Sequence, residues 1–183
     1  MLVRYKTRKR RAPKPRVDWT KASLPGDLIQ IDTKYISQHG TRLYQYTLID
    51  VVSRWRYVEI HRQSDMKTTI DFLGRALKQS AFVTLVIQSD NGSEFGQSVT
   101  KWLRDHKIKH VFSHKGRPTE NAYVERSHRT DEEEFYSVGK MGETLQDLRD
   151  NVADYMDMYN TKRPHWGLGG KTPQEMLTYY SMT

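Results

Sequence analysis

The sequence predicts an α/β domain built on a five-stranded mixed sheet, three antiparallel strands and then two more, with helices on both faces. Two observations predict this fold. Apolar, β-branched runs recur with short connections over residues 28–60, which is typical of an antiparallel meander. From residue 65 onward, apolar residues at helical spacing alternate with short apolar runs, the order expected when helices cover both faces of a sheet.

The first half of the chain supplies the meander and one helix. The predicted strands comprise residues 28–36, 43–49 and 56–60. Gly40 marks the turn between the first two strands. Apolar residues at positions 70, 73, 77 and 81 then fall on one side of a helix, and Asp65 is placed to cap its start.

The middle of the chain alternates strand and helix. Residues 82–87 form an apolar run typical of a strand buried on both faces, and the turn sequence 88–92 ends it. A helix should follow, with one apolar side, and then a short strand at residues 109–112. The predicted apolar side consists of Phe95, Val99, Trp102, Leu103 and His106.

The last third is predicted to be helical. A polar helix of about 18 residues should begin at Thr119, and the glycine-containing segment 139–142 should break it. Thr144 and Asp147 have capping-box spacing before an amphipathic helix. The apolar stripe of that helix is Leu145, Leu148, Val152, Tyr155 or Met156, and Tyr159. Residues 167–172 are interpreted as a turn before a helix that starts at Pro173.

Composition limits the class of protein. The 183 residues suffice for one compact domain with a core. Cysteine is absent, which excludes disulfides and thiolate metal sites. No apolar run approaches the roughly 18 residues of a membrane span, and the basic N-terminus lacks the apolar stretch of a signal peptide. We therefore expect a soluble intracellular protein with no membrane partner.

The net charge of +8 is concentrated at one end of the chain. Residues 1–16 hold eight Lys and Arg and no acid, which leaves 22 Lys plus Arg against 22 Asp plus Glu in the remainder. We expect residues 1–24 to be a basic arm or linker and residues 25–183 to be the folded core. Such an arm is typical of a segment that binds a polyanion. A solvated terminus and a nuclear-import signal are the alternatives that charge alone leaves open.

Three acids lie where the predicted sheet brings them together. Asp32 is in the middle of the first strand, on the face with Gln30 and opposite Ile29 and Ile31. Asp90 follows the buried strand, at the end where open α/β sheets place their ligands. The third acid, Glu125, lies within the polar helix. Taken singly, each acid also fits a surface or turn position, although strand sequences disfavour Asp unless something uses it.

Four blocks of sequence resemble the integrase catalytic core, a family shared by retroviral integrases and bacterial insertion-sequence transposases. The blocks are Ile31-Asp32-Thr33, Leu48-Ile49-Asp50-Val51-Val52-Ser53-Arg54, Gln88-Ser89-Asp90-Asn91-Gly92-Ser93-Glu94-Phe95 and Asn121-Ala122-Tyr123-Val124-Glu125-Arg126. The tail, residues 159–165 and 172–175, looks like the insertion-sequence branch. The resemblance covers roughly residues 25–178, and the 34 residues between Asp90 and Glu125 are a separation typical of the family.

The resemblance implies an RNase H-like fold and metal-dependent phosphodiester chemistry at DNA ends, followed by transesterification into target DNA. It implies that Asp32, Asp90 and Glu125 are catalytic and hold two divalent ions, Mg²⁺ or Mn²⁺, because hard cations prefer carboxylate oxygens. Without metal, three such carboxylates should repel one another, so the site should be loose or partly protonated. The partners are then double-stranded DNA, as element ends and target, and further copies of the chain, at least a dimer when active. The location is the cytoplasm, in association with the nucleoid in a bacterium.

DNA contacts are expected from cationic or imidazole side chains of the arm and of the segment around Glu125. These residues are Arg8, Lys9, Arg10, Arg11, Lys115, Arg117, Arg126, His128 and Arg129. The sequence departs from the family in two ways. The position seven residues after Glu125, often Lys or Arg in the family, is Glu132. No helix-turn-helix or zinc-binding segment precedes the core, so the chain is interpreted as either a fragment or a reduced form.

Three other functions compete with strand transfer. A metal-dependent nuclease of the same fold needs the same acids. A catalytically silent DNA-binding module does not need them, and intact acids at all three positions argue against it. A tyrosine recombinase would form a covalent DNA adduct and would tolerate EDTA.

Overall fold

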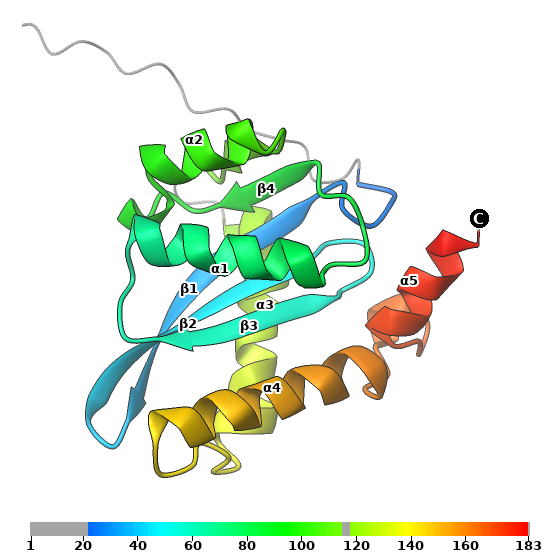
Figure 1. Cartoon of the computed structure of the whole chain (residues 1–183). Helices are drawn as coiled ribbons and strands as arrows, with labels where there is room; N and C mark the ends of the chain where they lie inside the picture. The colour runs from blue at the N-terminus through cyan, green and yellow to red at the C-terminus, as the bar shows by residue number, and fades with distance from the viewer. Residues whose placement is uncertain (1–21, 115–117, 183) are drawn as a thin grey trace, which may run out of the picture.

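A computed structural model of the chain describes residues 22–114 and 118–182, arranged around one five-stranded sheet (Figure 1). Its strands are β1 (Ile29–Gln38), β2 (Thr41–Asp50), β3 (Arg56–His61), β4 (Val86–Ser89) and β5 (Lys109–Phe112). Their order across the sheet is β3-β2-β1-β4-β5. The first three strands are antiparallel, and β4 and β5 continue the sheet in parallel with β1. The predicted mixed sheet is therefore confirmed.

Short turns fix the register of the meander. His39 and Gly40 connect β1 to β2, and both have positive φ, 46° and 75°. Two such residues suit a two-residue hairpin whose twist matches that of the strands. At the other end of β2, the buried carboxylate of Asp50 accepts hydrogen bonds from the Ser53 N–H at 2.6 Å and from the Gly26 N–H at 2.9 Å. These bonds hold the start of β1 and the turn before β3 together.

One face of the sheet is covered by α1 (Met66–Gln79) and α2 (Gln97–Asp105). Asp65 caps α1 as predicted, because its Oδ1 accepts from the Thr68 N–H at 2.8 Å. Apolar residues of β1 face these helices in the main core cluster. This cluster includes Ile29, Ile31, Phe72, Leu73, Val99 and Leu103. Because side chains alternate along a strand, Gln30 and Asp32 point to the opposite face.

That opposite face carries α3 (Ala122–Asp131), which packs against β1 and β2. The helix is preceded by the 3₁₀ turn η3 (Pro118–Asn121) and followed by the π-helical turn η4 (Glu132–Tyr136). The predicted helix of about 18 residues from Thr119 therefore exists as three consecutive pieces of different helical geometry. Gly139 and Gly142 end it as expected, each with positive φ.

The second helix on this side, α4 (Leu145–Thr161), starts at the predicted capping box of Thr144 and Asp147. Its buried stripe packs with β3 and Phe135 in a second core cluster. Side chains of α4 also form hydrogen bonds with backbone groups of β3, the edge strand of the sheet. The side-chain amide of Asn160 pairs with both the N–H and the C=O of Arg56, at 2.9 and 2.8 Å, and Arg149 donates to the Ile60 C=O at 3.0 Å.

The prediction of a strand at residues 82–87 was wrong in its start, because β4 begins at Val86. Val83 and Leu85 are 79% and 53% exposed, so the run is not buried on both faces. Residues before β4 instead run against the loop at Gly26, whose C=O accepts from the Leu85 N–H at 2.8 Å. A Cβ on Gly26 would lie 2.0 Å from the Val83 oxygen, so only glycine allows this approach.

The chain ends in the short turn η5 (Trp166–Leu168) and α5 (Pro173–Ser181), which lies at the periphery of the molecule (Figure 1). The predicted turn at 167–172 is present, with positive φ at Gly169 and Gly170. Residues 1–21, most of the predicted basic arm, lie outside the described residues. Within the described residues, no helix has the length and apolar character needed to cross a bilayer.

Candidate active site

The three predicted acids are carried by β1, β4 and α3. The pairing of β1 with β4 aligns Gln30 with Gln88 in parallel strands. Asp32 and Asp90 each lie two residues beyond this pair, so they lie at the same level of neighbouring strands, Asp32 within β1 and Asp90 just past the end of β4. Glu125 lies in the first turn of α3, the helix that packs on β1.

The electrostatics of Asp32 link it to the other acids. Burial, with smaller contributions from the negative charges of Asp90, Glu125 and Glu94, raises the pKa of Asp32 to about 7, although hydrogen bonding from the Thr33 N–H lowers it. A shift of this kind arises when like charges crowd a poorly solvated carboxyl. It agrees with the expectation that the site without metal is partly protonated.

Glu94 is a fourth acid at this site, and it was not singled out from the sequence. The loop that carries it is tightly folded. The Asp90 Oδ1 accepts from the Gly92 N–H at 2.7 Å, and a Cβ on Gly92 would lie 2.5 Å from Glu94 Oε2 and 2.9 Å from Asp90 Oδ1. Glycine at position 92 thus lets two carboxylates approach the same point of the backbone. The only sequence signal was the four-residue spacing of Asp90 and Glu94.

The carboxylates are neighbours without being gathered around one point. No set of three His, Asp or Glu side chains in residues 22–114 and 118–182 has the arrangement of a metal site. Asp90 and Glu125 have exposed side chains, whereas the Asp32 side chain is only 22% exposed. Side-chain rotation of the exposed acids is therefore the movement by which a cation could be ligated.

His128 lies beside Asp32 and is mostly buried. Its Nδ1 is 3.6 Å from Asp32 Oδ2, and its side chain is 13% exposed. Burial lowers the pKa of His128 to about 4, and the Asp131 charge opposes this less strongly. The imidazole is therefore neutral at pH 7, and its Nε2 is buried without a hydrogen-bond partner. A buried neutral ring is a weaker candidate for a phosphate contact than an exposed cation.

A lysine from β1 lies close to the position where the family often has a helix cation. The Nζ of Lys34 is 2.7 Å from Glu132 Oε2 and 4.8 Å from the centre of the Tyr136 ring. Lys34 lies two residues beyond Asp32 on the same face of the strand. The position where the family often has a cation is Glu132 in this chain, and Lys34 of β1 supplies a positive charge beside it. Sequence reasoning found Glu132 but missed its partner.

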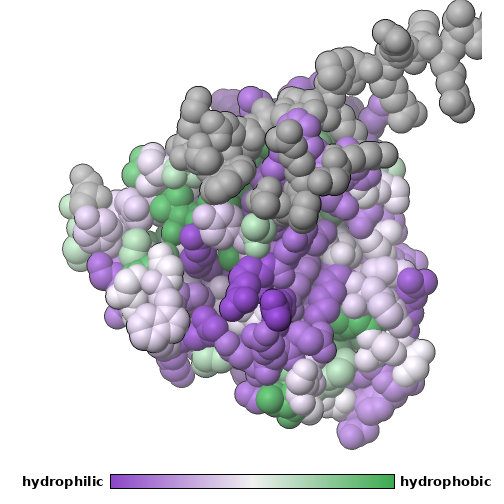
Figure 2. Space-filling view, turned by 180° about the vertical axis from the view of Figure 1, so that it is seen from behind, coloured by the Kyte–Doolittle hydropathy of each residue, from purple (hydrophilic) through white to green (hydrophobic). Residues whose placement is uncertain are grey.

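The other predicted DNA contacts divide into two groups. Arg126 and Arg129 are exposed on α3, where Arg129 pairs with Glu133 at 3.1 Å. The face that carries α3 is largely hydrophilic along its middle (Figure 2). The remaining predicted contacts lie outside the described residues: Arg8, Lys9, Arg10, Arg11, Lys115 and Arg117.

A buried ion pair anchors the far end of α3. Arg56 Nη2 lies 2.6 Å from Asp131 Oδ2, and the two side chains are 0% and 3% exposed. Gln45 also donates to Asp131, at 2.7 Å, and Tyr136 donates to Gln45. The opposite charge of Asp131 raises the pKa of Arg56 although burial lowers it. The helix that carries Glu125 is thus attached to β2 and β3 at its C-terminal end.

Comparison with known proteins identifies the fold and the family. A family model described as "Integrase core domain" matches residues 22–118, more than half of the chain, and a second model with the same description matches residues 106–173. The chain belongs to the integrase core domain family. The transposase for insertion sequence element IS904 of Lactococcus lactis is 30% identical over 167 residues, 88% of this chain and 65% of that protein.

A second relative from an insertion element also matches most of the chain. A 39.2 kDa protein of insertion element IS476 from Xanthomonas euvesicatoria is 28% identical over 184 residues, 96% of this chain and 52% of that protein. This integrase core therefore spans about half to two thirds of the length of these relatives.

Two solved structures that share the fold come from retroviruses. The HTLV-2 integrase catalytic core domain in complex with magnesium superposes with a TM-score of 0.69 at 19% identity, covering 83% of this chain and 96% of that one. A simian T-cell lymphotropic virus intasome gives a TM-score of 0.75 at 18% identity, covering 91% of this chain and 59% of that one. These likenesses establish the RNase H-like fold of the integrase core.

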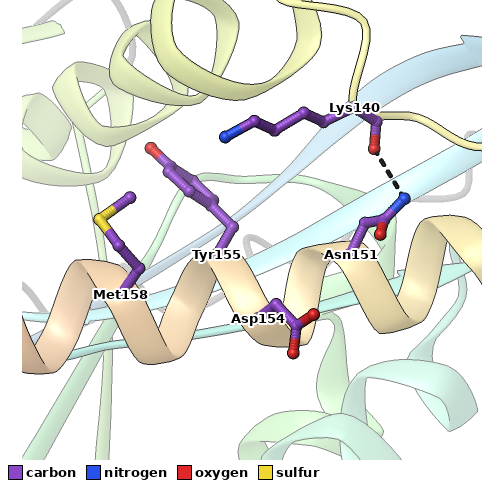
Figure 3. Close-up of a pocket in the computed structure, with 5 residues that line it drawn as sticks. All are labelled: Lys140, Asn151, Asp154, Tyr155 and Met158. Carbon is purple, nitrogen blue, oxygen red and sulfur yellow. Dashed lines mark hydrogen bonds between the residues drawn. The ribbon is translucent and has the colours of Figure 1, made fainter.

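The integrase core also has a cavity of about 300 Å³ beside α4 (Figure 3). Asn151, Asp154, Tyr155 and Met158 of α4 line it with Lys140, whose C=O accepts from Asn151 Nδ2 at 3.1 Å. None of the residues that raise the pKa of Asp32 lines this cavity, so it is not part of the candidate active site.

Proposed function

We propose that this chain is the catalytic core of a DNA-strand transferase that uses Asp32, Asp90 and Glu125 to hold two divalent ions, Mg²⁺ or Mn²⁺. The single observation that carries the proposal is that the pairing of β1 with β4 and the packing of α3 on β1 bring Asp32, Asp90 and Glu125 together, close enough for the other two charges to raise the pKa of Asp32. A cluster of carboxylates that raises a pKa in this way is stabilised when a cation neutralises it. Oxygen-only donors suit hard divalent cations.

The residues present fit such a centre by their chemistry. In the proposed arrangement Asp32, Asp90 and Glu125 would together hold the ions. When bound, two divalent ions would supply activation of the attacking oxygen and stabilisation of the leaving oxygen. Glu94 adds a fourth negative charge close enough to Asp32 to raise its pKa.

The reaction first hydrolyses one phosphodiester bond at a DNA end and then, in joining, exchanges one phosphodiester bond for another. For end nicking, water attacks the phosphorus and the strand leaves with a free 3′-hydroxyl. For joining, that hydroxyl attacks a target phosphate, a new P–O bond forms, and the target strand leaves with its own 3′-hydroxyl and the proton. The reaction needs neither ATP nor a covalent protein–DNA intermediate, because the number of phosphodiester bonds is unchanged in joining.

The DNA backbone would pass along the hydrophilic face of α3. Exposed Arg126 and Arg129 support this path, and the basic arm and Lys115 and Arg117 are proposed to extend it. Lys34, two residues along β1 from Asp32 and on the same face, is proposed to release Glu132 and contact a phosphate when DNA binds. A protein that joins two DNA ends needs at least two active sites, so the active form is proposed to be a homodimer or larger. Its place of action is the DNA of the cytoplasm.

The test is a strand-transfer assay with a pre-nicked donor DNA, Mn²⁺ and target plasmid. We expect joined products that EDTA removes and that Asp32→Asn abolishes. The matched control is Asp71→Asn, an exposed Asp on α1 that pairs with Lys67, which should leave joining unchanged. Shortened products without joining would indicate a nuclease instead, and joining by the Asp32→Asn protein would refute the proposal.

A further inference from the structure

Two buried glutamines lie directly behind the candidate catalytic aspartates. Gln30 and Gln88 precede Asp32 and Asp90 by two residues each, are both 1% exposed, and are aligned by the β1–β4 pairing. Their side chains are joined, because Gln30 Nε2 donates to Gln88 Oε1 at 3.2 Å. The two aspartates therefore extend from strands that are linked both by the sheet and by this amide pair.

The amide of Gln30 also holds the helix that carries the glutamate. Its Oε1 accepts from the backbone N–H groups of Tyr123 and Val124, both at 3.1 Å. Its Nε2 donates to the Glu120 C=O at 2.8 Å. The first N–H groups of a helix have no partner within the helix, and here the side chain of a strand residue supplies it. The two bonded N–H groups immediately precede Glu125.

The hydrogen-bonding capacity of Gln30 is filled. A primary amide has two donor hydrogens and an oxygen that accepts two bonds, and all four are used across β1, β4, η3 and α3. Gln88 extends the network to the loop after β5, since its Nε2 donates to Ser113 Oγ at 3.3 Å. Any shift of α3 relative to β1 would break bonds of a buried amide, which costs about 1–3 kcal/mol for each group left unsatisfied.

We propose that Gln30, supported by Gln88, is the positioning residue that sets the separation of Asp32, Asp90 and Glu125 and thereby the affinity of the site for divalent ions. The inference rests on the proposed function and adds the element that aligns the three acids. Residues that orient metal ligands typically change metal affinity by about 10–100-fold when they are replaced. If the Gln30 amide served only to stabilise the core, its replacement would lower stability and leave the metal affinity unchanged.

The same strand offers a matched control. Gln38, at the far end of β1, is 6% exposed, and its Nε2 donates to three backbone carbonyls: those of Met141 at 3.0 Å, Gly142 at 3.2 Å and Thr144 at 3.0 Å. It is a buried glutamine that fastens a segment following α3 to β1, but it lies six residues beyond Asp32. Gln38→Met therefore removes the same amide from the same strand as Gln30→Met does, but it leaves the hydrogen bonds behind the acids intact.

The experiment measures Mn²⁺ binding without DNA, from the rise in melting temperature of the whole chain as Mn²⁺ is titrated. We expect Gln30→Met to raise the Mn²⁺ midpoint about tenfold or more, and Gln38→Met to leave it within about twofold of wild type. If Gln30→Met does not fold, Gln88→Met replaces it, with an expected rise of about threefold. Urea unfolding of each variant supplies the stability loss against which the midpoints are compared.

Two results would separate failure of this inference from failure of the proposed function. If Asp32→Asn loses the Mn²⁺ response but the Gln30→Met and Gln88→Met midpoints stay at the wild-type value or move no more than that of Gln38→Met, the positioning role is refuted and the metal site stands. If wild type has no Mn²⁺ response, or if Asp32→Asn retains it, the metal site itself is refuted, and the positioning role with it.

Discussion

Replacing Asp131 with Ala should destabilise the domain more than any change on the exposed face of α3. Asp131 is the partner of fully buried Arg56, and the contact is a single 2.6 Å approach. Arg56 Nε and Nη1 have no hydrogen-bond partner, so the guanidinium depends on this carboxylate and on the Tyr159 ring 4.5 Å away. Loss of one member of a buried pair costs about 3–5 kcal/mol, a large share of the roughly 5–15 kcal/mol of a typical domain.

Urea unfolding measures this cost, with Glu133→Ala as the control on the same helix. Glu133 pairs with Arg129, and both side chains are more than half exposed, so its removal should cost less than about 1 kcal/mol. The double variant Arg56→Met with Asp131→Leu should recover most of the loss, because no buried charge remains. An Asp131→Ala loss below about 1 kcal/mol, or a double variant as unstable as the sum of its single changes, would refute the reasoning.

Three further predictions concern pH, the loop at the acids and DNA. Burial raises the pKa of Glu59, but hydrogen bonds from Arg75 and neighbouring side chains outweigh this and lower the pKa to about 2. The ionised Glu59 therefore stabilises the folded state fully above its unfolded pKa of about 4.5, and this stabilisation should be lost as the pH falls toward 2. Urea unfolding at pH 6 and pH 3 should show a loss of about 1–3 kcal/mol that Arg75→Met reduces. Gly92→Ala should weaken Mn²⁺ binding because its Cβ would collide with two carboxylates, whereas Gly167→Ala, in open space, should not; equal midpoints would contradict this. If arm and core neutralise about six phosphates, log K for DNA should fall with log salt at a slope near −5, and a filter-binding slope near zero would exclude the arm from DNA binding.

Local sequence patterns predicted most of the elements, because helix periodicity, capping residues and turn glycines act over a few positions. The capping box at Thr144 and the cap at Asp65 are such signals, and both are present. The start of the strand predicted at 82–87 was wrong because hydrophobicity alone does not determine which residues pair with a neighbouring strand. Its register is set by Gly26, which is distant in sequence.

The candidate site was predictable only in part for the same physical reason. Asp32, Asp90 and Glu125 were singled out because the predicted sheet brings them together and because each lies in a sequence block that resembles the integrase core. The roles of Lys34, Glu94 and Gln30 depend on partners brought close by the fold, 98 residues away for Lys34 and 94 residues away for the Gln30 bond to Val124. Pairings over such distances leave no local pattern in a single sequence.

A crystal structure of the whole chain soaked in Mn²⁺ tests the account most directly, because anomalous scattering locates each ion without reference to the protein coordinates. We expect two peaks about 3.5–4 Å apart, ligated by Asp32, Asp90 and Glu125, with the two exposed acids turned toward the buried one. Ions bound elsewhere, or ordered Asp32, Asp90 and Glu125 side chains with no ion between them at saturating Mn²⁺, would contradict it.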